Sequence, residues 1–278
     1  MALILAAACA LVYGVADFCG GKATRHAATW TVTAGSQLVG FVTVLVALPF
    51  VASDGPRGRD LVLGAVGGIA GAVGVMVLYH ALAHGTMSVV SPVTAICAAI
   101  VPVVCSLALF GQRPSRLALA GIAAALVAIA LVSLHGDNRR DAHVMRTIGW
   151  SVAAGCGFGV FFVFLDRTSD HAGLWPLVAA RPVSIVLAAA VALRRRQPVL
   201  PNRAAWPLVA AAGAGDMAAN ILFLLASTHG DLAITAAVAS LYPVSTVALA
   251  RVVDHERLRP TQFVGLAVAL GALVLIAL

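Results

Sequence analysis

Charged side chains inside long apolar stretches are the residues of this sequence best suited to chemistry. Arg181 lies in the first half of the stretch 174–193, and Asp216 lies near the middle of the stretch 204–227. A charge in the hydrocarbon of a membrane costs about 2.5–3.5 kcal/mol by insertion scales, so such residues are candidates for function. We predict that Arg181 and Asp216 interact in a cavity and belong to a substrate or proton path. A static ion pair that only fixes helix packing is the alternative.

Five further polar side chains lie in similar stretches. Asn220 lies one helical turn after the aspartate of its stretch, Asp17 lies toward the end of the first stretch, and Gln37 lies in the second. Amides bind substrate or join helices through hydrogen bonds, and Asp17 lies among lipid headgroups if its helix ends early. Tyr79 and Tyr242 can line a cavity or anchor helices at the membrane surface. All five are candidates for the same path, with a structural role open for each.

The composition requires these stretches to be membrane segments. The chain has 278 residues, of which 61% are hydrophobic and 10% charged, with a mean hydropathy of +1.00. A soluble protein carries about 25% charged residues, so this chain has too few to cover a surface in water. The net charge of +7 comes from arginines in the short polar breaks, such as 194–196. Arginines beside membrane spans set orientation, so the charge does not indicate nucleic-acid binding.

Ten apolar blocks follow one another along the chain. Each is close to the roughly 20 residues that a helix needs to cross about 30 Å of hydrocarbon. We therefore predict an all-α integral membrane protein with ten transmembrane helices. The blocks are Ala2–Cys19, Ala28–Phe50, Leu61–Ala83, Met87–Phe110, Leu117–Leu134, Ile148–Leu165, Leu174–Leu193, Ala204–Ser227, Leu232–Val253 and Phe263–Leu278.

The two halves of the chain repeat one another at a nearly constant offset. Because five helices are an odd number, two fused copies must lie in opposite orientations, as in the inverted repeats of secondary transporters. We predict two five-helix repeats, 1–137 and 147–278, with a substrate site near their interface. The offset is 145 residues for Tyr13-Gly14 and Phe158-Gly159, Lys22 and Arg167, Trp30 and Trp175, and His84-Gly85 and His229-Gly230. It is 144 residues for Gln112-Arg113 and Glu256-Arg257, and for Gly121 and Gly265.

Two short motifs in each half resemble the ten-helix EamA type of the drug/metabolite transporter superfamily. The resemblance implies a secondary transporter in the bacterial cell membrane that exports or exchanges metabolites, amino acids or drugs, with a proton or another cation as the candidate coupling ion. The motifs are Tyr13-Gly14, Phe18 and Lys22 in the first half, Phe158-Gly159, Phe162 and Arg167 in the second half, and the segments 110–115 and 254–258. Gln112 departs from the glutamate that is usual in the family, whereas Glu256 keeps it.

Other classes of function have less support. The sequence has no P-loop, HExxH helix, hydrolase elbow or Rossmann glycine pattern, so we expect no enzyme activity, catalytic residue, cofactor or metal site. A membrane-embedded enzyme or lipid-intermediate processor without a transport cycle remains the alternative. The expected partners are a small-molecule substrate and the lipid bilayer. Loop arginines favour both termini outside, whereas the resemblance implies both inside, so the orientation stays open, as do the substrate and the oligomeric state.

Overall fold

The computed structural model describes residues 1–110, 115–133, 142–229, 232–254 and 260–278. The second motif of each half, Gln112-Arg113 and Glu256-Arg257, lies outside these residues. The described residues form helices and no strand. In chain order the elements are α1 (Ala2–Ala23), α2 (Thr29–Ala47), the 3-10 helix η1 (Leu48–Phe50), α3 (Gly58–His84), α4 (Met87–Phe110), α5 (Arg116–Ser133), α6 (Ala142–Asp166), α7 (Trp175–Arg194), α8 (Trp206–Ser227), α9 (Leu232–Ala239), α10 (Pro243–Val253) and α11 (Pro260–Ala277).

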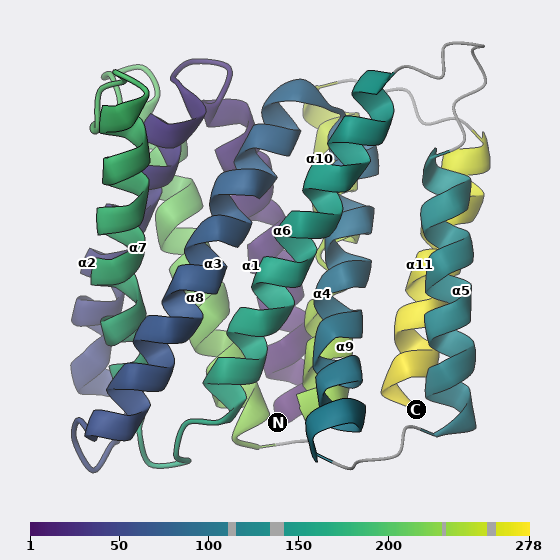
Figure 1. Cartoon of the computed structure of the whole chain (residues 1–278), viewed down its shortest axis with the longest axis horizontal. Coiled ribbons are helices and arrows are strands. Elements are labelled where there is room, and N and C mark those ends of the chain that lie inside the picture. Colours follow the sequence, from purple (N-terminus) through teal and green to yellow (C-terminus); the bar gives the residue numbers. More distant parts are fainter. Residues whose placement is uncertain (111–114, 134–141, 230–231, 255–259) are drawn as a thin grey trace.

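The helices lie side by side in one bundle, and Figure 1 shows the N- and C-termini at the same end of it. Six spans, formed by α1, α2 with η1, α3, α6, α7 and α8, are long and apolar enough to cross a membrane by length and composition. Shorter apolar helices supply the other blocks. The all-helical, multi-pass membrane protein expected from the sequence is therefore confirmed.

The ninth predicted span is not one continuous helix. It is divided into α9 and α10 at Ser240–Tyr242, so the prediction of a single helix over 232–253 was wrong. Pro243 has no amide hydrogen to continue the helical ladder. The amides of Leu241 and Tyr242 instead donate to carbonyls three residues earlier, at 3.1 and 3.3 Å. Irregular backbone at membrane depth is tolerated where it lies inside protein or lines a cavity.

The outer surface of the bundle is apolar. On α3, Val62, Val66, Ile69 and Val73 are exposed and follow one another at helical spacing. The opposite side of α3 is also apolar or small, with Leu78 almost fully buried. A helix that is apolar on both sides is stable only where lipid replaces water on its outer face.

Glycines allow helices from the two halves to approach closely. A Cβ atom added at Gly68 in α3 would lie 2.7 Å from the backbone of Ala180 in α7. The equivalent contact with the halves exchanged is made by Gly213 in α8, where an added Cβ would lie 2.3 Å from the carbonyl oxygen of Ser36 in α2. Small residues at both places let the backbones meet, as is typical of membrane helices.

A second pair of glycines, Gly14 and Gly159, also makes one type of contact twice, with the two halves exchanged. A Cβ atom added at Gly14 in α1 would lie 2.6 Å from the carbonyl oxygen of Tyr242, between α9 and α10. One added at Gly159 in α6 would lie 3.1 Å from the carbonyl oxygen of Ala98 in α4. Likewise α1 packs along α8, and α6 packs along α3. The first helix of each half therefore contacts the third and fourth helices of the other half.

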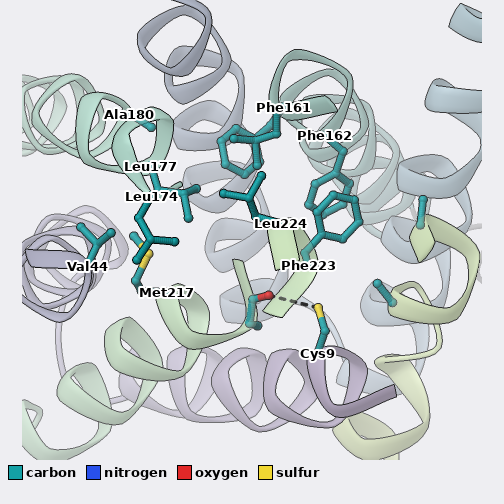
Figure 2. Packing of buried hydrophobic residues seen from close by; sticks show 14 of the residues in the cluster. Cys9, Val44, Phe161, Phe162, Leu174, Leu177, Ala180, Met217, Phe223 and Leu224 are labelled. Atoms are coloured by element: carbon teal, nitrogen blue, oxygen red, sulfur yellow. Dashed lines mark hydrogen bonds between the residues drawn. The ribbon is translucent and has the colours of Figure 1, made fainter. Parts of the chain in front are cut away.

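A cluster of apolar side chains holds α1, α6 and α8 together. Figure 2 shows Phe162 of α6 against Phe223 of α8, with ring centroids 4.3 Å apart and planes nearly parallel. In the same view the thiol of Cys9 donates a hydrogen bond to the carbonyl of Ala219, over 3.2 Å. These contacts fix α1 and α8, which carry Asp17, Asp216 and Asn220 of the cavity described next.

Candidate substrate cavity

A cavity lies among α1, α2, α3, α4, α6, α7, α8 and the break between α9 and α10. It contains about 750 Å³ of space free of atoms, part of which is open to the outside. All seven residues selected from the sequence line this one cavity. They are Asp17, Gln37, Tyr79, Arg181, Asp216, Asn220 and Tyr242. Their role in a substrate or proton path stays a prediction.

Arg181 is the centre of a polar group that joins three helices. It comes from α7, and its side chain is only 7% exposed. Its Nη2 atom donates to Oδ2 of Asp216 in α8 at 2.7 Å, and its Nη1 atom donates to Oε1 of Gln37 in α2. The predicted contact between Arg181 and Asp216 is therefore present. Pairing offsets the cost of placing both charges inside the bundle.

Asn220 extends this group toward α1. Its Nδ2 atom donates to the backbone carbonyl of Asp216 at 2.7 Å, which confirms that the two residues share one face of α8. Its Oδ1 atom accepts a hydrogen bond from the hydroxyl of Tyr13 at 2.9 Å. One chain of hydrogen bonds therefore runs from α2 through α7 and α8 to α1.

Asp17 differs from Asp216 in having no such support. It lies one helical turn after Tyr13, and α1 continues beyond it to Ala23. The possibility that the helix ends early and leaves this carboxylate beside the headgroups is thus wrong. No hydrogen bond or ion pair joins Asp17 to another described residue, although it lies close enough to Asp216 for an electrostatic interaction.

Tyr79 and Tyr242 are buried inside the bundle, at 2% and 6% exposure. The ring of Tyr79 lies over Gly20, where an added Cβ atom would come within 2.4 Å of it. The ring centroid of Tyr242 is 6.1 Å from that of Tyr13, and its hydroxyl is 3.5 Å from the carbonyl oxygen of Ser91. Their burial does not fit the alternative in which they anchor helices at the membrane surface.

Several lining residues were not selected from the sequence. Phe158 and Phe162 could have been found from the repeat, since they lie at the offset of 145 from Tyr13 and Asp17. Tyr13 belongs to the first motif of its half, so its position also had a signal in the sequence. No sequence signal separates the other ones from ordinary apolar or small residues. The lining residues that were not selected include Tyr13, Phe158, Phe161, Phe162, Ser184 and Ser240.

The cavity supplies hydrogen-bond donors, acceptors, charge and aromatic walls, which are the parts of a binding site. Among the residues that the structure describes, no group of three or more His, Cys, Asp or Glu side chains could hold a metal ion. The cavity therefore contains the kinds of group that binding of a small molecule requires.

The comparison with protein families decides the class. The model of the EamA-like transporter family matches the chain twice, over residues 1–134 and 145–278. The chain belongs to the EamA-like transporter family. Membership indicates a multi-pass membrane transporter of small molecules.

Comparison with solved structures supports the fold. One of them, described only as the crystal structure of a protein, has a TM-score of 0.70 to this chain. The match covers 99% of this chain and 95% of the other, at 16% sequence identity. No curated protein matches this chain. At such low identity the structural match supports the fold alone.

Proposed function

We propose that this EamA-family chain is a secondary transporter that moves small metabolites, amino acids or drugs by alternating access, as an ion- or proton-coupled exporter. The observation that carries the proposal is that equivalent positions of the two halves line one cavity. Examples are Tyr13 and Phe158, Gln37 and Arg181, Gly71 and Asp216, Val75 and Asn220, and Ala98 and Tyr242. A site built from two equivalent halves can open to one side and then to the other when the halves exchange conformations.

Helix directions support an inverted relation between the halves. Gly67 approaches Phe164, whereas Gly74, further along α3, approaches Phe158, which comes earlier in α6. The helices α3 and α6 are therefore antiparallel. Since α1 and α3 run in the same direction, α1 and α6 run in opposite directions (Figure 1). This arrangement is the one that an inverted repeat of five helices requires.

Two carboxylates in the cavity support the ion-coupled part of the proposal. Asp216 is bound to Arg181, whereas Asp17 has no ion-pair partner among the described residues. An intramembrane carboxylate can bind a proton or a cation at one side of the membrane and release it at the other. The family resemblance favours export or exchange, and efflux of substrate from loaded, oriented vesicles tests the export direction.

Accessibility to a thiol reagent from each side of the membrane tests alternating access. Ser240→Cys and Ala98→Cys place thiols on the cavity lining, in a background whose five native cysteines are replaced by serine or alanine. A membrane-impermeant reagent should label each cavity thiol from both faces of oriented vesicles, in proportions that change with a transported substrate. The matched control Val66→Cys lies on the exposed outer side of α3 and should show no substrate effect.

Labelling from one face only, under every condition, would contradict alternating access and favour the alternative of an enzyme open to one side. The same vesicles can test coupling. Substrate flux driven by an imposed proton or sodium gradient is expected, and flux that ignores both gradients would remove the ion-coupled part of the proposal.

A further inference from the structure

The charges that line the cavity do not cancel. Its charged side chains are Asp17, Asp216 and Arg181. Arg181 is joined to Asp216 at 2.7 Å and to Gln37, so this positive charge is already neutralised. The carboxylate of Asp17 has no ion-pair partner among the described residues. The cavity therefore carries one negative charge in excess when both carboxylates are ionised.

The same arrangement works against negatively charged substrates. A substrate carboxylate would have to replace Asp216 at Arg181, and it would then leave the carboxylate of Asp216 without a partner inside the bundle. Removing one member of a buried pair is costly because the other charge is left uncompensated. A positively charged group, in contrast, can approach Asp17 without breaking any interaction that the structure contains.

Aromatic rings complete a site for a cation. The chain has three tyrosines, and all of them, Tyr13, Tyr79 and Tyr242, line the cavity. Each lies close enough to Asp17 for an electrostatic interaction. The faces of aromatic rings attract cations, most strongly where water is excluded. The phenyl rings of α6, including Phe162, supply an apolar wall for the hydrocarbon part of a ligand.

We propose that the cavity selects organic cations, with an ammonium group beside Asp17 and an apolar or aromatic body against the rings of α6. This inference rests on the proposed function and specifies its substrate class. The cation displaces water rather than a protein partner from Asp17, and the bound pair of Arg181 and Asp216 stays intact.

Four compounds of similar size and different charge test the proposal by direct binding to the purified protein in nanodiscs. Benzylamine is a cation at neutral pH, benzyl alcohol is neutral, benzoate is an anion and phenylalanine is a zwitterion. The expected order places benzylamine first and benzoate last. Asp17→Asn should weaken benzylamine binding by at least ~10-fold, because it removes the charge partner. The same change should leave benzyl alcohol binding within about twofold, because no charge is involved.

Controls separate a specific effect from a folding defect. Asp17→Glu keeps the charge and should retain the preference for the cation. Asp54→Asn removes an exposed carboxylate outside the cavity and should change nothing. Size-exclusion chromatography and thermal unfolding monitor the fold of each variant. If Asp17→Asn does not fold, the order of the four compounds on the wild-type protein still decides.

Tighter binding of benzoate or phenylalanine than of benzylamine would overturn the proposal. So would equal benzylamine binding by folded Asp17→Asn, or no benzylamine binding by the wild-type protein at millimolar ligand. Binding in nanodiscs does not require a transport cycle, so the two proposals can fail separately. Cation binding with labelling from one face only would refute alternating access, whereas labelling from both faces with anion preference would refute the substrate class.

Discussion

The second half of the chain brings a charged pair to the cavity, whereas the equivalent positions of the first half carry uncharged residues. Arg181 corresponds to Gln37 at the offset of 144 that also relates Ala180 to Ser36, the backbone partners of Gly68 and Gly213. Asp216 corresponds to Gly71 at an offset of 145. The situation is reversed in the first helix of each half, where Asp17 corresponds to Phe162. Each half therefore contributes one carboxylate, at positions that are not equivalent.

Packing positions behave differently from these lining positions. Gly68 and Gly213 lie at the offset of 145 and make the same close contact with the halves exchanged. The backbone framework is thus shared by the two halves, while the chemistry is distributed unequally over it. We therefore expect substitutions at equivalent packing positions of the two halves to lower stability by similar amounts. Substitutions at equivalent cavity positions should change stability and transport unequally.

The largest effect is expected from breaking the charged pair. Asp216→Asn leaves the guanidinium of Arg181, which is 7% exposed, with Gln37 as its remaining side-chain oxygen partner in the described structure. The loss of one member of a buried pair should lower the free energy of unfolding by about 3 kcal/mol. SDS-induced unfolding in mixed micelles and transport in proteoliposomes measure the two consequences.

The double variant Arg181→Gln with Asp216→Asn separates a structural from a functional role. Without either charge the uncompensated guanidinium is gone, so stability should recover most of the loss. Transport should remain absent if the pair serves the substrate or proton path. Wild-type transport by a folded Asp216→Asn protein, with an unchanged pH profile, would remove the pair from the mechanism.

Equivalent glycine changes should have equal and intermediate effects. Gly68→Ala and Gly213→Ala both place a methyl group against backbone atoms, at 2.7 and 2.3 Å, which cannot be relieved by a rotamer change. Each should cost about 1–3 kcal/mol through forced separation of the helices, measured by SDS-induced unfolding. Gly271→Ala is the control, because nothing lies within 4 Å of an added Cβ there. A large effect at one position and none at the other would contradict the shared framework.

Much of the fold follows from local signals in the sequence. The ten blocks are visible because hydrocarbon requires long apolar segments, and residues such as Asp216 stand out because charge is costly within them. The division at Ser240–Tyr242 was harder to anticipate. Proline is tolerated within α4 and α7, which contain Pro92 and Pro182 respectively. The presence of Pro243 alone therefore does not predict that a helix ends there.

The cavity could be predicted only through its polar members. Asp17 and Gln37 were recognisable by type, although nothing in the sequence revealed that one is unpaired and the other holds Arg181. That difference depends on the contacts between α2 and α7, which are distant in the chain. Aromatic lining residues such as Phe161 resemble lipid-facing residues by type, and only their burial assigns them to the interior.

A smaller effect is expected at the end of α10. The carboxylate of Asp254 is 7% exposed and lies 2.7 Å from Lys22 Nζ and 2.8 Å from Arg25 Nη2. Asp254→Asn should lower the free energy of unfolding by about 1 kcal/mol, near the upper limit for ion pairs that are not fully buried. Asp54→Asn removes a carboxylate from an exposed pair with Arg57 and should have no measurable effect. Equal losses of unfolding free energy in both variants would show that the ion pairs of Asp254 stabilise the protein no more than an exposed ion pair does.

The smallest effect is expected from making one equivalent pair of the cavity identical. Tyr13→Phe copies the residue found at Phe158 and removes the hydroxyl that donates to Asn220 at 2.9 Å. A net loss of about 0.5 kcal/mol is expected, at the low end for a hydrogen bond, because water in the cavity can donate to the amide instead. The reverse change, Phe158→Tyr, is the matched control. The ring of Phe158 lies against Gly74 of α3, so a hydroxyl on it should not restore the contact with Asn220 in the double variant. Transport by Tyr13→Phe within about twofold of the wild type, with a nearly unchanged unfolding curve, would agree with this small loss of stability. Complete loss of transport would show that the hydroxyl belongs to the transport path itself.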